Sequence, residues 1–159
     1  MNDEAFDLSL GYFRGSLDSV LTAIQHAGLE DAVLELEGAP SEELFDFAEE
    51  LTADDPDLRR RNHHARHGGW RLGPIHFGGG PLYVPVSDEN VARLREIADR
   101  HAAVEIAFEL RVLAGDETLL CAPDVGDNEI WVSRRLSGRA VAAIRTALGS
   151  GLDQRDADV

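Results

Sequence analysis

Residues 104–133 read VEIAFELRVLAGDETLLCAPDVGDNEIWVS, and this stretch decides the fold class. Large apolar side chains occupy every second position from 104 to 112, which is the period of a half-buried strand. These residues are Val104, Ile106, Phe108, Leu110 and Val112. Turn signals at 115–116 and 124–128 lead into further strand-like segments at 118–122 and 129–133. The pattern predicts an antiparallel three-stranded meander.

A hairpin is expected to precede the meander. Segments 70–77 and 81–86 flank the glycine run 78–80, a pattern that predicts a loose hairpin over about 70–86. Pro85 makes the second arm an edge strand or the end of one, because proline cannot donate to a sheet ladder.

Four amphipathic helices are expected around these strands. Apolar residues recur at spacings of three and four after Ser16, over about 41–51, after Ser87 and over about 137–148. Segment 56–67, PDLRRRNHHARH, follows a helix-start signal but has almost no apolar stripe. A helix there would therefore be largely exposed.

These elements predict one α+β domain over 1–149 with an antiparallel sheet, because the strands cluster instead of alternating with helices. The alternation of Phe6, Leu8 and Leu10 suggests a further short strand near the N-terminus. Segment 32–37 is interpreted as a short strand or an extended link. The polar, acidic residues 150–159 are expected to form a frayed, disordered tail.

The charge of the chain is its most unusual property. There are 30 acidic and 15 basic residues among 159, which gives a net charge of −15, and every basic residue is arginine. Residues 1–57 hold 16 acids and one arginine, whereas residues 58–103 hold eight arginines and four acids. A GC-rich genome, of bacterial type, accounts for the arginine bias. The imbalance informs about partners and solubility but not about the fold.

The lack of lysine excludes several classes of enzyme. Schiff-base chemistry, a pyridoxal phosphate anchor, the phosphate-loop lysine and the kinase lysine all need one. The serine-hydrolase motif G-x-S-x-G is also missing. Glu105 and Glu109 would share one face of the expected strand, where solvent is the simpler neighbour than a reacting group. We therefore lean towards a protein that is not an enzyme.

The single cysteine bears on the compartment. Cys121 has no partner within the chain, so no intramolecular disulfide forms, and a cytoplasmic location is favoured. The predicted strand around it favours a buried, inert thiol. The first residues, MNDEAFDLSL, are acidic where a secretion signal would be basic, and no apolar stretch has the length of a membrane span.

A histidine-rich run carries the metal hypothesis. On a helix His63 and His67 would share a face, and His64 and His67 lie three apart, so either pair would suit zinc. His76 is a further candidate from outside the run. The glutamate of an H-E-x-x-H site is absent, which excludes that protease class. Neighbouring arginines also oppose a dication, and the simpler interpretation is a solvated helix end without a cofactor.

The same run is rich in arginine and could contact an anion. The candidates are Arg59, Arg60, Arg61, Arg66 and Arg71. Trp70 would add a stacking surface for nucleic acid, but a chain of net charge −15 repels a polyanion. An anionic small ligand, or the acidic helix of the same chain, is the easier partner.

The helix expected at 41–51 carries a row of acids on its outer face. They are Glu42, Glu43, Asp46, Glu49 and Glu50. A soluble outer face explains such a row, and a docking surface for a basic protein is the functional alternative. Inhibitors and immunity-type proteins for nucleases often work in this way, because their targets are basic.

Three hypotheses follow from the sequence. The favoured one is a non-catalytic binding protein, inhibitor-like or immunity-like, that docks a basic partner through its acidic N-terminal third. The alternative is a metal-binding protein or metal-dependent hydrolase that uses His63, His64 and His67. In the third, acidic and basic parts pair with each other, either between protomers of a homo-oligomer or within one chain. No hypothesis involves a membrane.

Overall fold

The computed structural model describes residues 8–73, 75–77 and 79–153, without the side chains of Arg71 and of residues 75–77. The strands are β1 (Leu8–Arg14), β2 (Val33–Glu37), β3 (Trp70–Leu72), β4 (Ile75–Phe77), β5 (Leu82–Pro85), β6 (Glu109–Ala114), β7 (Glu117–Ala122), β8 (Asp127–Val132) and β9 (Leu152–Asp153). Seven of them form an antiparallel sheet in the order β5-β2-β6-β7-β8-β1-β9, while β3 and β4 pair separately. The expected α+β class with an antiparallel sheet is confirmed, as is the meander of β6, β7 and β8.

Five helices accompany the sheet. They are α1 (Leu17–Ala27), α2 (Glu42–Leu51), α3 (Pro56–His67), α4 (Asp88–Asp99) and α5 (Gly138–Leu148). Each amphipathic helix is preceded by a serine whose hydroxyl oxygen accepts a hydrogen bond from a backbone N–H of the first turn. These serines are Ser16 before α1, Ser41 before α2, Ser87 before α4 and Ser137 before α5. Asp55 does the same for α3. Each cap satisfies a donor that the first helical turn leaves free.

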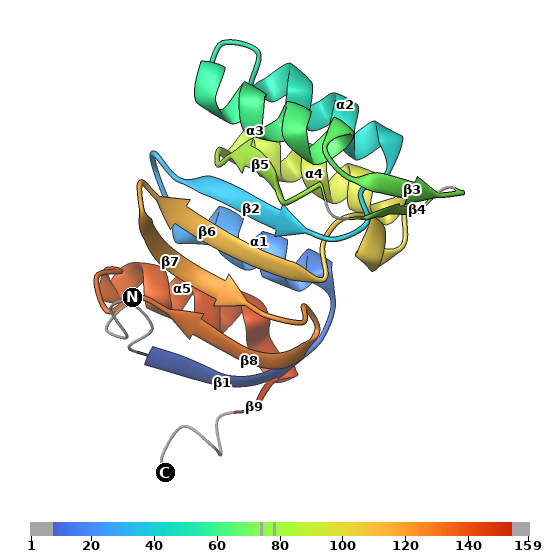
Figure 1. Ribbon diagram of the computed structural model, residues 1–159. Coiled ribbons are helices and arrows are strands. Elements are labelled where there is room, and N and C mark those ends of the chain that lie inside the picture. The colour runs from blue at the N-terminus through green and yellow to red at the C-terminus, as the bar shows by residue number, and fades with distance from the viewer. Residues whose placement is uncertain (1–7, 74, 78, 154–159) are drawn as a thin grey trace.

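The sheet has one covered and one open face. Helices α1, α4 and α5 lie behind the sheet in Figure 1, and no helix of the described chain crosses the face turned to the viewer. The centre of the covered face is apolar, with Leu34, Leu36, Leu110 and Val112 all 0% exposed. Burial of this face against the helices supplies the main stabilising term of the domain. The described residues include no helix that is both long and apolar enough to cross a membrane.

Helices α2 and α3 form a separate pair beyond β5, at the upper end of the molecule in Figure 1. Asn62 of α3, 0% exposed, joins this pair to the sheet. Its carboxamide donates to the carbonyl oxygen of Tyr83 at 2.9 Å and accepts from the Tyr83 N–H at 2.8 Å. It therefore occupies the outer edge of β5 as a neighbouring strand would. Pro85 lies on this edge strand, as its chemistry predicts.

The expected hairpin over 70–86 is wrong in its pairing. The first arm folds back on itself as β3 and β4, whereas β5 leaves it and pairs with β2. Burial explains the choice, because Leu82 and Val84 are 0% exposed beside β2 while Trp70 and Leu72 remain 62% and 65% exposed.

The strand that was expected to begin at Val104 is also wrong in its first half. Residues Ala103–Glu105 form a short 3-10 helix, and β6 begins only at Glu109. The carbonyl oxygens of Val104 and Glu105 accept bonds from the N–H groups of Ala39 and Ser41. These loop contacts replace a sheet ladder, and Val104 and Phe108 stay 50% and 47% exposed.

The first and last described residues, 8–14 and 152–153, contribute strands to the sheet. Strand β1 confirms the expected N-terminal strand from Leu8 onwards, while Phe6 lies outside the described residues. The expected tail at 150–159 is wrong for its first part, since Leu152 and Asp153 pair with Phe13 and Tyr12 as β9. Leu152 is 7% exposed, so burial of one apolar side chain accounts for the attachment. Residues 154–159 lie outside the described part.

Candidate functional site

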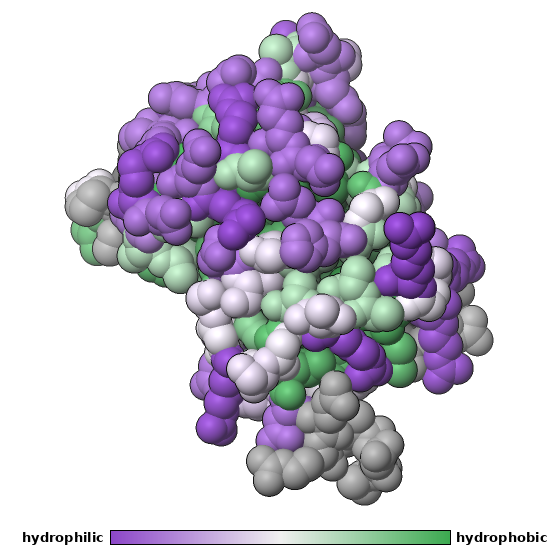
Figure 2. All heavy atoms as spheres, turned by 180° about the vertical axis from the view of Figure 1, so that it is seen from behind, coloured by the Kyte–Doolittle hydropathy of each residue, from purple (hydrophilic) through white to green (hydrophobic). Residues whose placement is uncertain are grey.

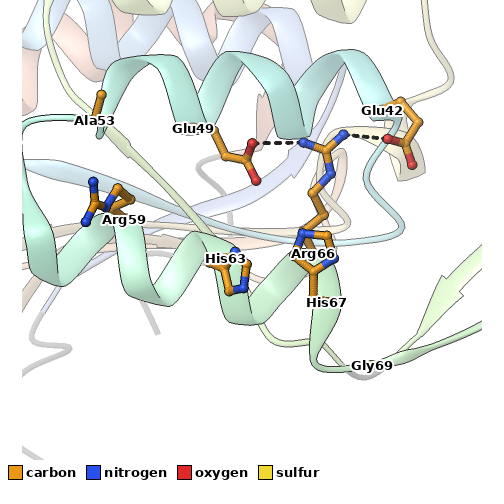
Figure 3. Close-up of a pocket in the computed structure, with 8 residues that line it drawn as sticks. All are labelled: Glu42, Glu49, Ala53, Arg59, His63, Arg66, His67 and Gly69. Carbon is orange, nitrogen blue, oxygen red and sulfur yellow. Dashed lines mark hydrogen bonds and ion pairs between the residues drawn. The ribbon is translucent and has the colours of Figure 1, made fainter.

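The acidic row on α2 meets an arginine of α3 in the structure. Arg66 Nη2 lies 2.6 Å from a carboxylate oxygen of Glu42, and its Nη1 lies 3.0 Å from Asp46 and 2.9 Å from Glu49. Figure 3 shows the guanidinium reaching up from α3 between Glu42 and Glu49. Its carbon lies 5.5 Å from the ring centre of the buried Phe45. Three carboxylates therefore share one cation whose side chain is only 17% exposed.

The other two acids of α2 pair with α4 and the segment that follows it. Glu50 binds Arg93 at 3.2 Å. Glu43 binds both Arg100 and the imidazole of His101, the latter at 2.7 Å. The hydrogen bond from Arg100, followed by that from His101, holds the pKa of Glu43 below its ordinary value.

The pairing within one chain, which the sequence offered as an alternative, is therefore present on α2. Five carboxylates meet three arginines, so negative charge remains in excess. The side chain of Asp46 is 70% exposed, so its carboxylate remains accessible to a partner. Figure 2, the view from behind, shows hydrophilic residues gathered over the upper end that carries α2 and α4. More white and green surface lies below, over α1 and α5.

An open hollow of about 820 Å³ lies between α2 and α3. Glu42 and Glu49 line it from α2, and Arg59, His63, Arg66 and His67 line it from α3. One wall is thus acidic and the other is basic or aromatic.

The histidine cluster divides between two hollows. His63 and His67 lie together, with ring centres 4.5 Å apart, as the i, i+4 spacing predicts. His64 instead lines a second hollow with Arg60, Arg61 and Tyr83. Within the described ranges, no group of three or more histidine, cysteine, aspartate or glutamate residues could hold a metal ion. The expected three-histidine set is therefore not assembled, and the side chain of His76 is not described.

The predicted anion-binding arginines divide between the same two hollows, with Arg59 and Arg66 at the first and Arg60 and Arg61 at the second. Arg60 and Arg61 both bind Asp57, at 2.8 and 3.1 Å, while Arg66 faces α2. Arg59 lines the large hollow, and the side chain of Arg71 lies outside the described part. At Arg60, Arg61 and Arg66, carboxylates of the same chain thus occupy the place that an external anion would take.

Glu105 and Glu109 were expected to share one strand face, and this is wrong, because Glu105 lies in a 3-10 helix and only Glu109 lies on β6. Glu105 accepts from the Ala102 N–H at 2.9 Å, while Glu109 binds Arg111 at 2.7 Å. Cys121 is 7% exposed, which confirms its expected burial. That burial raises the pKa of its thiol, so the neutral form is favoured.

Two features that the fold brings together were not predicted from the sequence. One is Asn62, hidden in a run of charged residues where only its lack of charge distinguished it. The other is a line of polar and aromatic side chains on the open sheet face, whose members come from six separate strands. No pattern within a few neighbouring residues predicts that these side chains lie side by side.

Comparison with known proteins adds no relative. No protein-family model matches the chain, and neither a curated protein nor a solved structure matches it.

Proposed function

We propose that this chain is a non-catalytic binding protein, inhibitor-like or immunity-like, that docks a basic partner through the acidic surface of α2. The observation that carries the proposal is the grouping of three carboxylates around one arginine. Arg66 orients Glu42, Asp46 and Glu49, yet it cancels only one of their three charges. The surface is therefore ordered before a partner arrives, and it remains negative.

Ordered charge of this kind favours fast and selective association. A basic partner would be steered by the net charge of −15 and would find carboxylates already held in place. Because the side chains are substantially exposed, each contact adds little energy and is screened by salt. The proposal therefore predicts binding that weakens steeply as ionic strength rises.

The test uses a labelled nona-arginine peptide as the probe, with fluorescence anisotropy at low and high salt. A triple variant, Glu42→Gln, Asp46→Asn and Glu49→Gln, should weaken binding by about tenfold at low salt, since three moderate charge contacts are lost. Unchanged affinity in this variant would remove the support for the proposal.

A matched control separates this surface from net charge alone. Glu30→Gln, Glu89→Gln and Asp124→Asn change the net charge by the same amount at exposed positions away from α2. Affinity in the control should fall by no more than about twofold, because long-range charge is screened. Melting curves of both triple variants establish that each remains folded.

The metal hypothesis keeps one supporting observation, the 4.5 Å separation of the His63 and His67 rings. Two imidazoles four apart on a helix would hold zinc with open positions left for further ligands, including a substrate. The test is zinc titration by calorimetry of the chain and of its His63→Ala, His67→Ala variant. Equal heats for the two proteins would contradict it.

A further inference from the structure

One line of side chains crosses six neighbouring strands of the sheet. From β5 to β1 its members are Tyr83, Glu35, Arg111, Cys121, Trp131 and Ser9, each directly opposite the next. Residues opposite one another point to the same face of a sheet. Their neighbours along the strands, such as Leu34, Leu110 and Val132, are 0% exposed beneath the helices. The line therefore points to the open face.

The charges on this face are held in place, and carboxylates exceed cations. The Tyr83 hydroxyl donates to Glu35 at 3.0 Å. Arg111 lies 2.7 Å from Glu109 and 3.9 Å from Glu35, so two carboxylates share one guanidinium. Further along, Glu129 accepts from Ser9 at 3.4 Å. The open face is thus a rigid platform with a negative surplus.

The residue types on this face are those that dominate binding interfaces. Trp131, Tyr83 and Arg111 belong to the three types enriched among residues whose loss weakens binding most. Half-buried Leu113 adds apolar area beside the polar groups. A β-sheet holds all of them without the entropy cost of ordering a loop.

The β5 end of this platform opens into a hollow of about 350 Å³. Tyr83, Val33 and Leu113 of the sheet form part of its lining. Three aspartates and one arginine supply the charged part, namely Asp55, Asp57, Asp116 and Arg61. Carboxylates again exceed cations, so the hollow would favour a cationic side chain.

We propose that the open sheet face, with this hollow at its end, docks a partly apolar segment of a partner protein that carries arginine or lysine. Its apolar side chains lie on Trp131 and Leu113, and a basic side chain enters the aspartate-lined hollow. The proposal rests on the proposed function and adds a docking surface separate from α2. A second copy of the chain is a poor occupant, because it would bring the same surplus of carboxylates and a net charge of −15.

The platform has the right width for a segment. Five spacings between six strands span about 24 Å, at about 4.8 Å each. That is the length of roughly seven residues of extended chain. An octapeptide that alternates valine with serine and carries arginine at both ends is therefore a suitable probe, because its valines can lie on the sheet face while a terminal arginine reaches the hollow.

The two tryptophans of the chain allow a direct test. In Trp70→Phe, Trp131 on the sheet face becomes the only tryptophan, and in Trp131→Phe the exposed Trp70 of β3 remains as the control reporter. Titration with the octapeptide at low salt should give a saturable blue shift in the first protein. The second should give no saturable shift and, by anisotropy of labelled peptide, at least fivefold weaker binding. Asp116→Asn should weaken binding in the Trp70→Phe background about twofold.

Each outcome decides between the two surfaces. The sheet-face proposal would be overturned if the α2 triple variant lost binding, the octapeptide did not shift the Trp131 emission, and Trp131→Phe kept full affinity. The α2 surface would then remain as the docking site. A Trp131 shift that survives the α2 substitutions would support the sheet face as a docking surface separate from α2. Absence of binding for both the octapeptide and nona-arginine would contradict both. A concentration-dependent dimer with a blue-shifted Trp131 in the absence of peptide would show that a second copy occupies the face, which also overturns the proposal.

Discussion

The α2–α3 pair and the open sheet face both carry more carboxylates than cations, but they are built differently. On α2 the acids are oriented by arginines that come from other helices, such as Arg66 and Arg93. On the sheet the charged residues are set by strand register, and ion pairs such as Arg111–Glu109 only refine their positions. Removal of one arginine should therefore free the carboxylates of α2 to move, whereas the side chains of the open sheet face remain placed by the hydrogen-bonded strands.

The largest expected effect concerns the link between the two regions. Asn62→Ala leaves the N–H and carbonyl of Tyr83 without their partner at the sheet edge, and it should lower the free energy of unfolding by about 2–4 kcal/mol. Asn90→Ala is the matched control, because Asn90 donates a single bond to Pro85 on the same strand and should cost about 1 kcal/mol. Urea unfolding measures both. Equal losses would mean that Asn62 is not what fastens α3 to the sheet.

The next effect tests whether arginine holds α2. Arg66→Met leaves three neighbouring carboxylates without their shared cation and should cost about 1 kcal/mol at low salt, a modest value because those acids are partly exposed. Arg60→Met, which breaks an exposed pair with Asp57, should stay within about 0.5 kcal/mol. Thermal melts over a salt series measure the difference. A loss for Arg66→Met that grows with salt would contradict an electrostatic origin.

A smaller effect depends on pH. Because Arg100 and His101 hold the pKa of Glu43 below its ordinary 4.5, the ionised carboxylate stabilises the folded state above that pH. The contribution is lost as the pH falls through the lowered value. Glu43→Gln should therefore melt below the unsubstituted chain at pH 7, and the gap should close in acid. In an Arg100→Gln background the gap at pH 7 should shrink, whereas an undiminished gap would contradict Arg100 as the main cause.

The smallest effect concerns the thiol on the open face. Burial raises the pKa of Cys121 above its ordinary 9.0, so little thiolate exists at pH 7–8 and the side chain is shielded. Reaction with Ellman's reagent should be at least tenfold slower in the folded chain than in urea. Equal rates would show that this part of the sheet opens readily, against the rigid platform inferred for it.

Much of the fold could be predicted because its signals are local. The serine caps and apolar stripes of the helices, and the turns between β6, β7 and β8, involve residues a few positions apart. The apolar alternation at 104–108 wrongly predicted a strand, because hydrogen bonds from the loop at 39–41 hold the backbone of Val104 and Glu105 in another conformation. The hairpin at 70–86 misled because β5 buries more apolar surface beside β2 than beside β3 or β4.

The candidate site was predictable only in part. The acidic row of α2 and the pairing of His63 with His67 follow from helical periodicity, and both are present. The separation of His64 from that pair depends on what packs against each side of α3. The contact of Arg66 with α2 needed the tertiary structure, because the partners lie up to 24 residues apart.

By itself the sequence determined the α+β class, the helix starts, the lysine-free chemistry and the acidic surplus, since each depends on composition or on short spacings. Only the tertiary structure decided that β5 pairs with β2, that Asn62 closes the sheet edge and that Trp131 and Arg111 share an open face. The physical reason is that strand partners are chosen by the total apolar surface that they bury together. That quantity belongs to the whole chain and to no single segment.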